Sequence, residues 1–184
     1  VLKPMKDLCF KKVHRDKMKN YAEFYEKLTK PIKTRSKWLY FVKAVNSVIT
    51  RIMPFIYLIL LLYLFWTRKN GMALIPFVFI PGTSFILLSL LRKILNQPRP
   101  YERWTISPLI IKDAKGQSMP SRHVFSAVVI SVCVLRVTTW AGIFLLILSA
   151  ILAFCRVLGG VHYPKDVVVG YITGLIAGSL LFLV

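Results

Sequence analysis

Seven residues in three separate segments of the chain have side chains that could act together on a phosphate group. In chain order they are Arg92, Arg99, Arg122, His123, Arg156, His162 and Asp166. The forked guanidinium of arginine matches tetrahedral oxyanions and keeps its charge at any physiological pH. Histidine is the side chain whose ordinary pKa lies near neutrality, so it can attack or carry a proton.

The spacing within the third segment favours a catalytic arrangement. Asp166 follows His162 by four residues, one helical turn, so its carboxylate can hold one imidazole nitrogen and present the other outward. With His123 as a second proton carrier, this set indicates phosphoryl transfer through a covalent histidine intermediate. A second interpretation stays open: arginines at helix ends can pair with lipid phosphates, and Pro164 with Asp166 can simply begin a helix.

The sequence offers no pattern for a metal site. It has no carboxylate cluster of the kind that binds Mg²⁺, and its three cysteines lack zinc-ligand spacing with histidine. We therefore expect a reaction without metal or other cofactor, in which the arginines neutralise charge.

Five apolar stretches must position these residues. They cover residues 45–66, 72–91, 123–140, 141–158 and 166–184 in a chain of 184 residues that is 56% apolar. About 20 apolar residues at about 1.5 Å each cross a bilayer, so the sequence predicts an all-α integral membrane bundle of about five transmembrane helices. The stripe of Gly170, Gly174 and Gly178 should let another helix approach closely.

The segment 92–122 cannot lie within the bilayer. It holds seven Lys or Arg residues, and at about 2.5–3.5 kcal/mol each their burial in lipid would cost roughly 20 kcal/mol. With five spans, this segment, the loop 159–165 and the N-terminal region should all lie on one face of the membrane.

The net charge of +19 is concentrated near the N-terminus. Residues 1–51 hold 14 Lys or Arg and 4 Asp or Glu, which gives +10. We expect residues 1–44 to form a basic amphipathic segment on membrane phospholipids, with Trp38 and Tyr40 as interface anchors, and residues 45–184 to form the catalytic domain. The long apolar runs disfavour nucleic-acid binding, and the positive-inside rule favours a cytoplasmic site.

The three segments resemble the motifs of the type 2 phosphatidic acid phosphatase (PAP2) superfamily. The family pattern is Lys, six residues, Arg-Pro; then Pro-Ser-Gly-His; then Ser-Arg, five residues, His, three residues, Asp. This chain has Arg92, six residues and Arg99-Pro100; then Pro120-Ser121-Arg122-His123; then Cys155-Arg156, five residues, His162, three residues and Asp166. The resemblance covers the C-terminal half.

This resemblance implies a role for each matching residue. His162 would attack phosphorus, Asp166 would orient it, and His123 would protonate the leaving group. The phosphate oxygens would be held by Arg92, Arg99, Ser121 and Arg156, with Lys93 as a secondary candidate. The implied substrates are lipid phosphates or diphosphates, such as phosphatidic acid, phosphatidylglycerophosphate or a polyprenyl diphosphate, hydrolysed without metal.

The chain also departs from the family pattern. Arg92 replaces lysine, Cys155 replaces serine, and two spans precede the first motif where many relatives have three. Arg122 replaces glycine and adds a cation, which we expect to favour a doubly charged or diphosphate substrate and thus make Arg122 a further phosphate ligand. An alternative is a non-catalytic lipid-phosphate binding or transport-type protein, although binding alone would need neither His123 nor His162.

Overall fold

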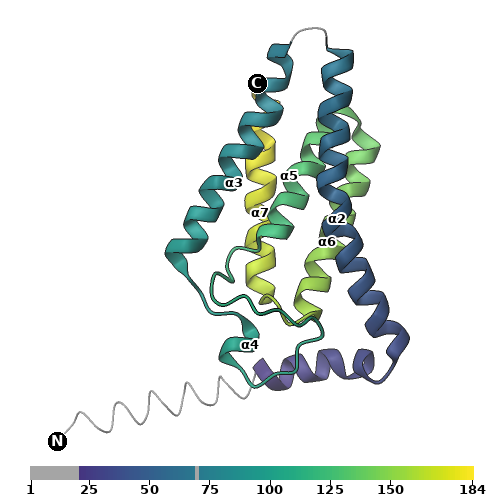
Figure 1. Ribbon diagram of the computed structural model, residues 1–184, viewed down its shortest axis with the longest axis vertical. Helices are drawn as coiled ribbons and strands as arrows, with labels where there is room; N and C mark the ends of the chain where they lie inside the picture. Colours follow the sequence, from purple (N-terminus) through teal and green to yellow (C-terminus); the bar gives the residue numbers. More distant parts are fainter. Residues whose placement is uncertain (1–20, 69–70) are drawn as a thin grey trace, which may run out of the picture.

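The computed structural model describes residues 21–68 and 71–184, and all the regular secondary structure in this part of the chain is helical, with irregular loops between the helices (Figure 1). A helical segment over 21–33 precedes α2 (Ser36–Thr67), η1 (Gly71–Leu74), α3 (Ile75–Leu95), α4 (Pro100–Arg103), α5 (Arg122–Val137), α6 (Thr139–Leu158), α7 (Pro164–Ser179) and η2 (Leu180–Phe182). The predicted all-α membrane bundle is confirmed. The part of the predicted basic segment that covers residues 1–20 lies outside the described residues.

Four helical stretches are long and apolar enough to cross a membrane: Ser36–Thr67, Gly71–Arg103, Thr139–Leu158 and Pro164–Phe182. The stretch predicted at 123–140 forms α5, which has only 16 residues and is therefore about 24 Å long. Helices α2, α3, α6 and α7 all pack against α5, and its residues from Val124 to Val134 are almost all buried. This shorter helix is the centre of the bundle.

The boundary between α5 and α6 differs from the prediction. Thr138 is extended, with φ −139° and ψ 105°, so α5 ends at Val137 and Trp140 belongs to α6. The turn is tight because Gly142 lies against the preceding helix, where a Cβ would come within 2.2 Å of the Leu135 Cα. The expectation that the third span continues to residue 140 is therefore wrong, since one extended residue reverses the chain.

The beginning of α2 also differs from the prediction. The helix starts at Ser36 rather than near residue 45, after Arg35 in an extended conformation. Trp38 and Tyr40 lie in its first two turns and are 52% and 77% exposed. The segment that we expected at the membrane surface thus divides into the helix over 21–33 and the first turns of a spanning helix.

The glycines of α7 lie directly against α5, as predicted. A Cβ on Gly170 would come within 2.8 Å of the Ser121 carbonyl oxygen, and one on Gly178 within 2.6 Å of the Val132 Cβ. These distances are too short for any side chain, so the two backbones pack in close contact. The contact at Gly170 joins α7 to the residue that precedes α5.

Helices α2 and α3 are joined through a carbonyl group that proline leaves free. Pro81 has no N–H to donate to the Phe77 carbonyl one turn earlier. The Tyr57 hydroxyl of α2 donates to that oxygen at 2.7 Å. The helix therefore continues through Pro81 with its backbone satisfied, while its lower part leans away from α2 (Figure 1).

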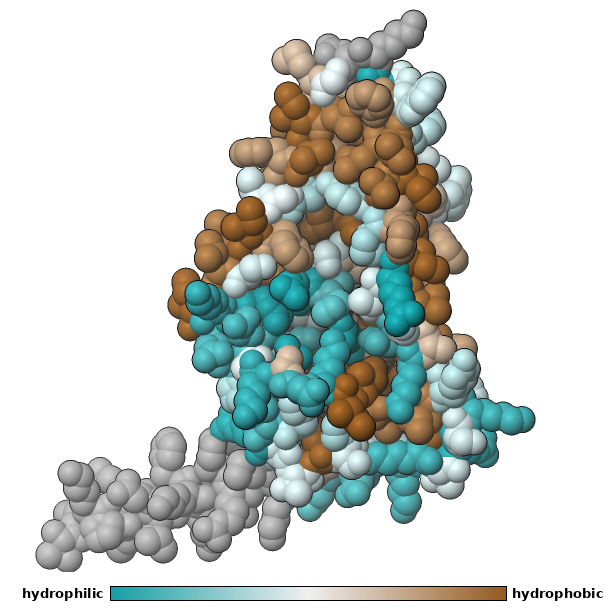
Figure 2. All heavy atoms as spheres, viewed as in Figure 1, coloured by the Kyte–Doolittle hydropathy of each residue, from teal (hydrophilic) through white to brown (hydrophobic). Residues whose placement is uncertain are grey.

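All loops that carry the sequence motifs lie at one end of the bundle. The segments 96–121 and 159–163 and the helix over 21–33 gather at the lower end in Figure 1, opposite the connection between α2 and α3. Figure 2 shows hydrophobic side chains over the upper part of the molecule and hydrophilic ones over the lower part. The described parts of the segments that we predicted to share a face therefore lie together at one end of the bundle.

We predict that Gly178→Ala lowers the free energy of unfolding by about 1–3 kcal/mol, because its Cβ would overlap Val132 across the packed helices. Gly82→Ala is the matched control, since no atom lies within 4 Å of its Cβ. Thermal unfolding of the detergent-solubilised protein measures both. Equal midpoints for the two variants would contradict the close packing of α7 on α5.

Candidate active site

Main-chain hydrogen bonds bring the three sequence motifs together. The Ser118 N–H donates to the Gln97 carbonyl at 2.8 Å, which joins the second motif region to the first. The Ser121 N–H donates to the Asp166 carbonyl at 2.9 Å, which joins it to the third. The segment that leads into α5 is therefore fixed between the end of α3 and the start of α7.

His162 is the best oriented of the candidate catalytic side chains. It is 2% exposed, in the turn between α6 and α7, and its Nδ1 lies 2.8 Å from the Ser118 carbonyl oxygen. A carbonyl can only accept a hydrogen bond, so Nδ1 carries the proton. The other ring nitrogen, Nε2, consequently has a free lone pair, as a nucleophile requires.

Asp166 acts on His162 mainly through Ser118. Its Oδ2 atom is 3.9 Å from Nδ1 of His162, while it accepts hydrogen bonds from the Ser118 hydroxyl and, at 3.1 Å, from the Tyr163 N–H. The four-residue spacing predicts a direct hydrogen bond from the His162 ring to the Asp166 carboxylate, and it gives no indication of Ser118 between them. The only feature of the sequence that could have pointed to Ser118 is its position two residues before the Pro120-Ser121 pair.

Burial keeps the His162 ring neutral. Desolvation, with the nearby Arg156 and Arg99 cations, lowers the pKa of His162 to about 4, although the Asp166 carboxylate opposes this shift. At neutral pH the ring is therefore unprotonated on Nε2. Its hydrogen bond to Ser118 and its charge state thus favour the same reactive form.

Arg156 is buried without a partner for much of its guanidinium. It is 1% exposed, and its Nε and Nη2 atoms have no hydrogen-bond partner among the described residues. The Ser121 hydroxyl is likewise buried and unpartnered within this part of the chain. A buried cation without a counter-charge costs several kcal/mol, so this arrangement fits an oxyanion ligand that accepts from these donors.

Arg92 and Arg99 hold the loop as well as adding charge. Both are at least nine-tenths buried. The Arg92 guanidinium donates to the carbonyls of Pro120 and Gln117, and Arg99 Nε donates to the Gly116 carbonyl at 3.0 Å. Two of the predicted phosphate ligands therefore also fix the backbone of residues 116–120.

The remaining predicted residues lie at different distances from this cluster. His123 is half-buried in the first turn of α5, and Arg122 is exposed with its guanidinium 5.7 Å from the centre of the Phe85 ring. Arg122 and His123 line the same cavity. Lys93 is exposed on α3, so the structure does not bring it into the buried cluster.

An apolar groove leads away from His123. A cavity of about 430 Å³ is lined by Arg122, His123 and residues of α2, α3, α5 and α6, and a second of about 390 Å³ follows it between α2, α3 and α5. The two share four lining residues, Pro54, Phe85, Ser126 and Ile130. We call them together the apolar groove. It has the composition that a hydrocarbon chain requires.

The helix over 21–33 supports the turn that carries His162. The buried Tyr25 hydroxyl donates to the Leu158 carbonyl at 2.9 Å and accepts from the Leu109 N–H at 3.3 Å. It lies against Gly160, whose φ of +71° and missing side chain allow the contact. Tyr25 thus ties the end of α6 to the loop after α4.

An aromatic cluster extends this support. The Tyr21 ring lies 5.0 Å from the Tyr163 ring and 5.3 Å from the Trp104 ring, and Trp104 Nε1 donates to the Tyr163 hydroxyl at 2.7 Å. Tyr163 directly follows His162. Nothing in the sequence marked these aromatic residues as neighbours, because they come from three distant segments.

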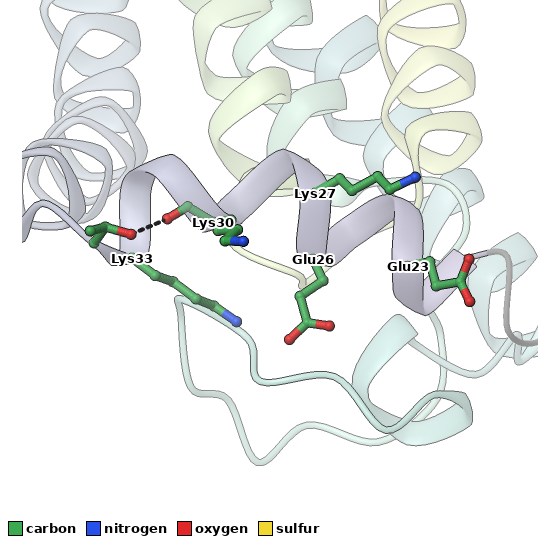
Figure 3. Close-up of a pocket in the computed structure, with 6 residues that line it drawn as sticks. Glu23, Glu26, Lys27, Lys30 and Lys33 are labelled. Carbon is green, nitrogen blue, oxygen red and sulfur yellow. Dashed lines mark hydrogen bonds between the residues drawn. The ribbon is translucent and has the colours of Figure 1, made fainter.

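A second hollow lies along the helix over 21–33 (Figure 3). It has a volume of about 550 Å³ and is lined by Glu23, Glu26, Lys27, Lys30, Lys33 and Thr34. Its lining mixes both charge signs, and it includes none of the motif residues. The described residues contain no group of three or more His, Cys, Asp or Glu side chains that could hold a metal ion.

The fold and the site together define a helical membrane protein with a buried arginine and histidine centre for a phosphate group. The model of the PAP2 superfamily matches residues 73–184. The chain belongs to the PAP2 superfamily, and it is a membrane lipid phosphatase of that type.

The relatives agree with this assignment. The chain is 32% identical to the undecaprenyl-diphosphatase BcrC of Bacillus subtilis (strain 168) over 146 residues. The aligned region covers 74% of this chain and 75% of BcrC. The crystal structure of Aquifex aeolicus LpxE superimposes on this chain with a TM-score of 0.68 at 22% sequence identity. The superposition covers 88% of this chain and 94% of the LpxE chain. A transmembrane PAP2 type phosphatidylglycerolphosphate phosphatase from Bacillus subtilis has a TM-score of 0.68 at 21% identity, covering 99% and 95%.

We predict that stability falls as the pH drops from about 6.5 towards about 4, the range between the ordinary pKa of histidine and that of His162. In this range the unfolded chain binds a proton that the folded chain does not, so the free energy of unfolding rises with pH. His162→Gln should flatten that part of the profile, measured by thermal unfolding in detergent. An identical slope in the variant would contradict the neutral, buried histidine.

Proposed function

We propose that this phosphatase hydrolyses a phosphate monoester or diphosphate of a lipid through a phosphohistidine intermediate. The observation that carries the proposal is the buried Arg156, with unpartnered donors beside a His162 whose Nε2 lone pair is free. We infer phosphatidic acid, phosphatidylglycerophosphate or a polyprenyl diphosphate as the substrate class, and the similarity to the undecaprenyl-diphosphatase BcrC supports the last of these.

In the first step, His162 Nε2 attacks phosphorus and forms a P–N bond. The P–O bond to the leaving group breaks, and its electron pair goes to that oxygen. His123, which lines the start of the apolar groove, gives a proton to this oxygen. Burial and the nearby Arg156 cation lower the pKa of His123, and the negative charge of a bound phosphate opposes that shift and favours the protonated ring. The Ser118 carbonyl accepts from Nδ1–H throughout, so it stabilises the ring as positive charge develops.

In the second step, water attacks the phosphorus of the phosphohistidine. His123, now unprotonated, takes a proton from the water, and the P–N bond breaks with its electron pair returning to Nε2. Inorganic phosphate leaves, and both histidines regain their starting states. Across the two steps, His123 first gives a proton and then takes one back, and His162 first forms and then loses its bond to phosphorus.

The cations stabilise the charge on the phosphate oxygens in both steps. Arg156 and Ser121 contribute the unpartnered donors, and Arg92 and Arg99 contribute charge while they hold the loop. Arg122 acts at the edge of the site, and Lys93 remains a secondary candidate for the lipid headgroup region because it is exposed.

The apolar groove supports an amphiphilic substrate. It begins at Arg122 and His123 and continues along α2, α3 and α5 within the part of the chain that spans the membrane. A phosphate head at His162 would place the attached hydrocarbon chain in this groove. Soluble sugar phosphates have no group that would use it.

We further propose that the protein lies in the bacterial cell membrane with the site facing the cytoplasm. Residues 45–184 then form the catalytic transmembrane domain, and the helix over 21–33 lies on the phospholipid surface at the end that carries the site. Basic residues support this orientation. The helix over 21–33 and the loop 104–121 lie at the end that carries the site (Figure 1), and they hold Lys27, Lys30, Lys33, Lys112 and Lys115.

We predict that His162→Ala lowers phosphate release by about a thousandfold or more, because the nucleophile is lost. Release by the unchanged protein should be inhibited by vanadate and resist a metal chelator. Lys165→Gln is the control, since this exposed residue lies three positions away at the start of α7. Undiminished turnover in His162→Ala would contradict the mechanism, as would lipid binding without any release in the unchanged protein.

We predict that a cysteine at position 115 is protected from an impermeant thiol reagent in intact cells and reacts after permeabilisation. Lys115 is exposed in the loop at the site end, whereas the native Cys133 and Cys155 are buried. Thr139→Cys, at the other end of the bundle, should react in intact cells; Cys9→Ser removes the remaining thiol. The reverse pattern would place the site outside.

A further inference from the structure

Two functional side chains lie close together in the chain where α6 ends. Arg156 belongs to the last turn of the helix, and His162 lies in the turn that leads to α7. Both side chains are almost completely buried. The main chain between them sets how the nucleophile and the arginine stand relative to a phosphate group, so whatever holds this main chain also controls the geometry of the reaction.

The last four carbonyl groups of α6 need donors from beyond the helix, because no further turn supplies them. Three of them are paired within the turn itself: the carbonyls of Cys155, Arg156 and Val157 accept from the N–H groups of Gly159, Val161 and Gly160, respectively. The fourth, that of Leu158, accepts from the Tyr25 hydroxyl at 2.9 Å, across 133 positions of the chain. Within the described part of the chain, Tyr25 is therefore the donor that completes the end of α6.

Tyr25 is itself firmly held. Its side chain is 1% exposed, and its hydroxyl also accepts from the Leu109 N–H at 3.3 Å. Its carbonyl accepts from the Thr29 hydroxyl one turn further along the same helix, at 2.8 Å. The missing side chain of Gly160 lets the phenol approach, since a Cβ there would lie 2.7 Å from the hydroxyl oxygen. A buried hydroxyl that both donates and accepts is restricted to one position.

The same helix also holds the chain on the other side of His162. Tyr163 is the next residue, and its ring lies 5.0 Å from the Tyr21 ring. The helix over 21–33 thus contacts the catalytic turn at two points, at Leu158 before the histidine and at Tyr163 after it. A turn that is held at both ends cannot tilt without breaking one of these contacts.

The other buried arginines are held by different elements. Arg92 and Arg99 come from the end of α3 and the residue before α4, and backbone carbonyls of the loop before α5 fix their guanidinium groups. None of these hydrogen bonds involves Tyr25. A displacement of the α6 end would therefore move His162 and Arg156 while much of the charge that binds the substrate stays in place. Such a change lowers the rate of the chemical step more than it weakens binding.

We propose that Tyr25 is a positioning residue of this phosphatase, which acts through the Leu158 carbonyl to align His162 and Arg156 with the phosphate group. This inference rests on the proposed function. Tyr25 takes no part in proton transfer or bond formation. It keeps the nucleophile at the distance and angle from phosphorus that the first step requires.

The test removes one hydroxyl group and measures turnover by the purified full chain in detergent, below the unfolding midpoints. Phosphate release is first measured with phosphatidic acid, phosphatidylglycerophosphate and farnesyl diphosphate, and the variants are compared on the substrate with the highest kcat/KM. Tyr25→Phe should lower kcat about tenfold and leave KM within about twofold, because His162 is misplaced while the binding charge remains.

Tyr171→Phe is the matched control. The Tyr171 hydroxyl also donates to a carbonyl of α6, that of Leu146 at 3.1 Å, which lies about 15 Å along the helix from Arg156. Both variants lose one hydrogen bond to the same helix, so both should lower the unfolding midpoint by a few degrees. In Tyr171→Phe, kcat should stay at the value of the unchanged protein.

The outcomes distinguish this inference from the proposed function. Absence of release from all three substrates by the unchanged protein, or full release by His162→Ala, overturns the proposed function. Equal kcat in Tyr25→Phe and Tyr171→Phe, within about twofold, overturns the positioning role alone, as does a raised KM with unchanged kcat. If Tyr25→Phe does not fold, Tyr21→Leu, which removes the ring contact with Tyr163, replaces it under the same criteria.

Discussion

The burial of arginine side chains without carboxylate partners is the constraint on which the site depends. A guanidinium removed from water must find acceptors, and a nearby carboxylate would compete with any phosphate ligand. Here the acceptors are backbone carbonyls: Arg92 uses those of Pro120 and Gln117, and Arg99 uses that of Gly116. Carbonyls hold the cations in place without cancelling their charge, so the positive field stays available.

That solution dictates much of the surrounding architecture. Carbonyls can serve as acceptors only if their loop is rigid, and the main-chain bonds of Ser118 and Ser121 fix residues 118–121 to the first and third motifs. The same loop supplies the carbonyl that holds His162. The glycine contact between α7 and α5 keeps the two ends of this assembly at a constant distance, because packed backbones cannot slide freely.

The sequence was sufficient to predict the bundle and to select most residues of the candidate site, because apolar length and motif spacing are local properties. It could not predict Ser118, whose role depends on where a loop folds back on the third motif, nor Tyr25, which meets Leu158 across 133 positions. The length of α5 was overestimated because Thr138 looks like any residue of an apolar run. In each case the missing information was a contact between distant segments.

The placement of Tyr25 has a consequence for how this protein is divided into parts. The family match begins at residue 73. The turn that carries His162 is nevertheless held in place by Tyr25, which lies more than 40 positions before the start of that match. The part of the chain that matches the family is therefore shorter than the part on which the site depends. A fusion, a proteolytic cut or a rearranged lipid surface that displaces the helix over 21–33 would act directly on the histidine turn, without touching any motif residue.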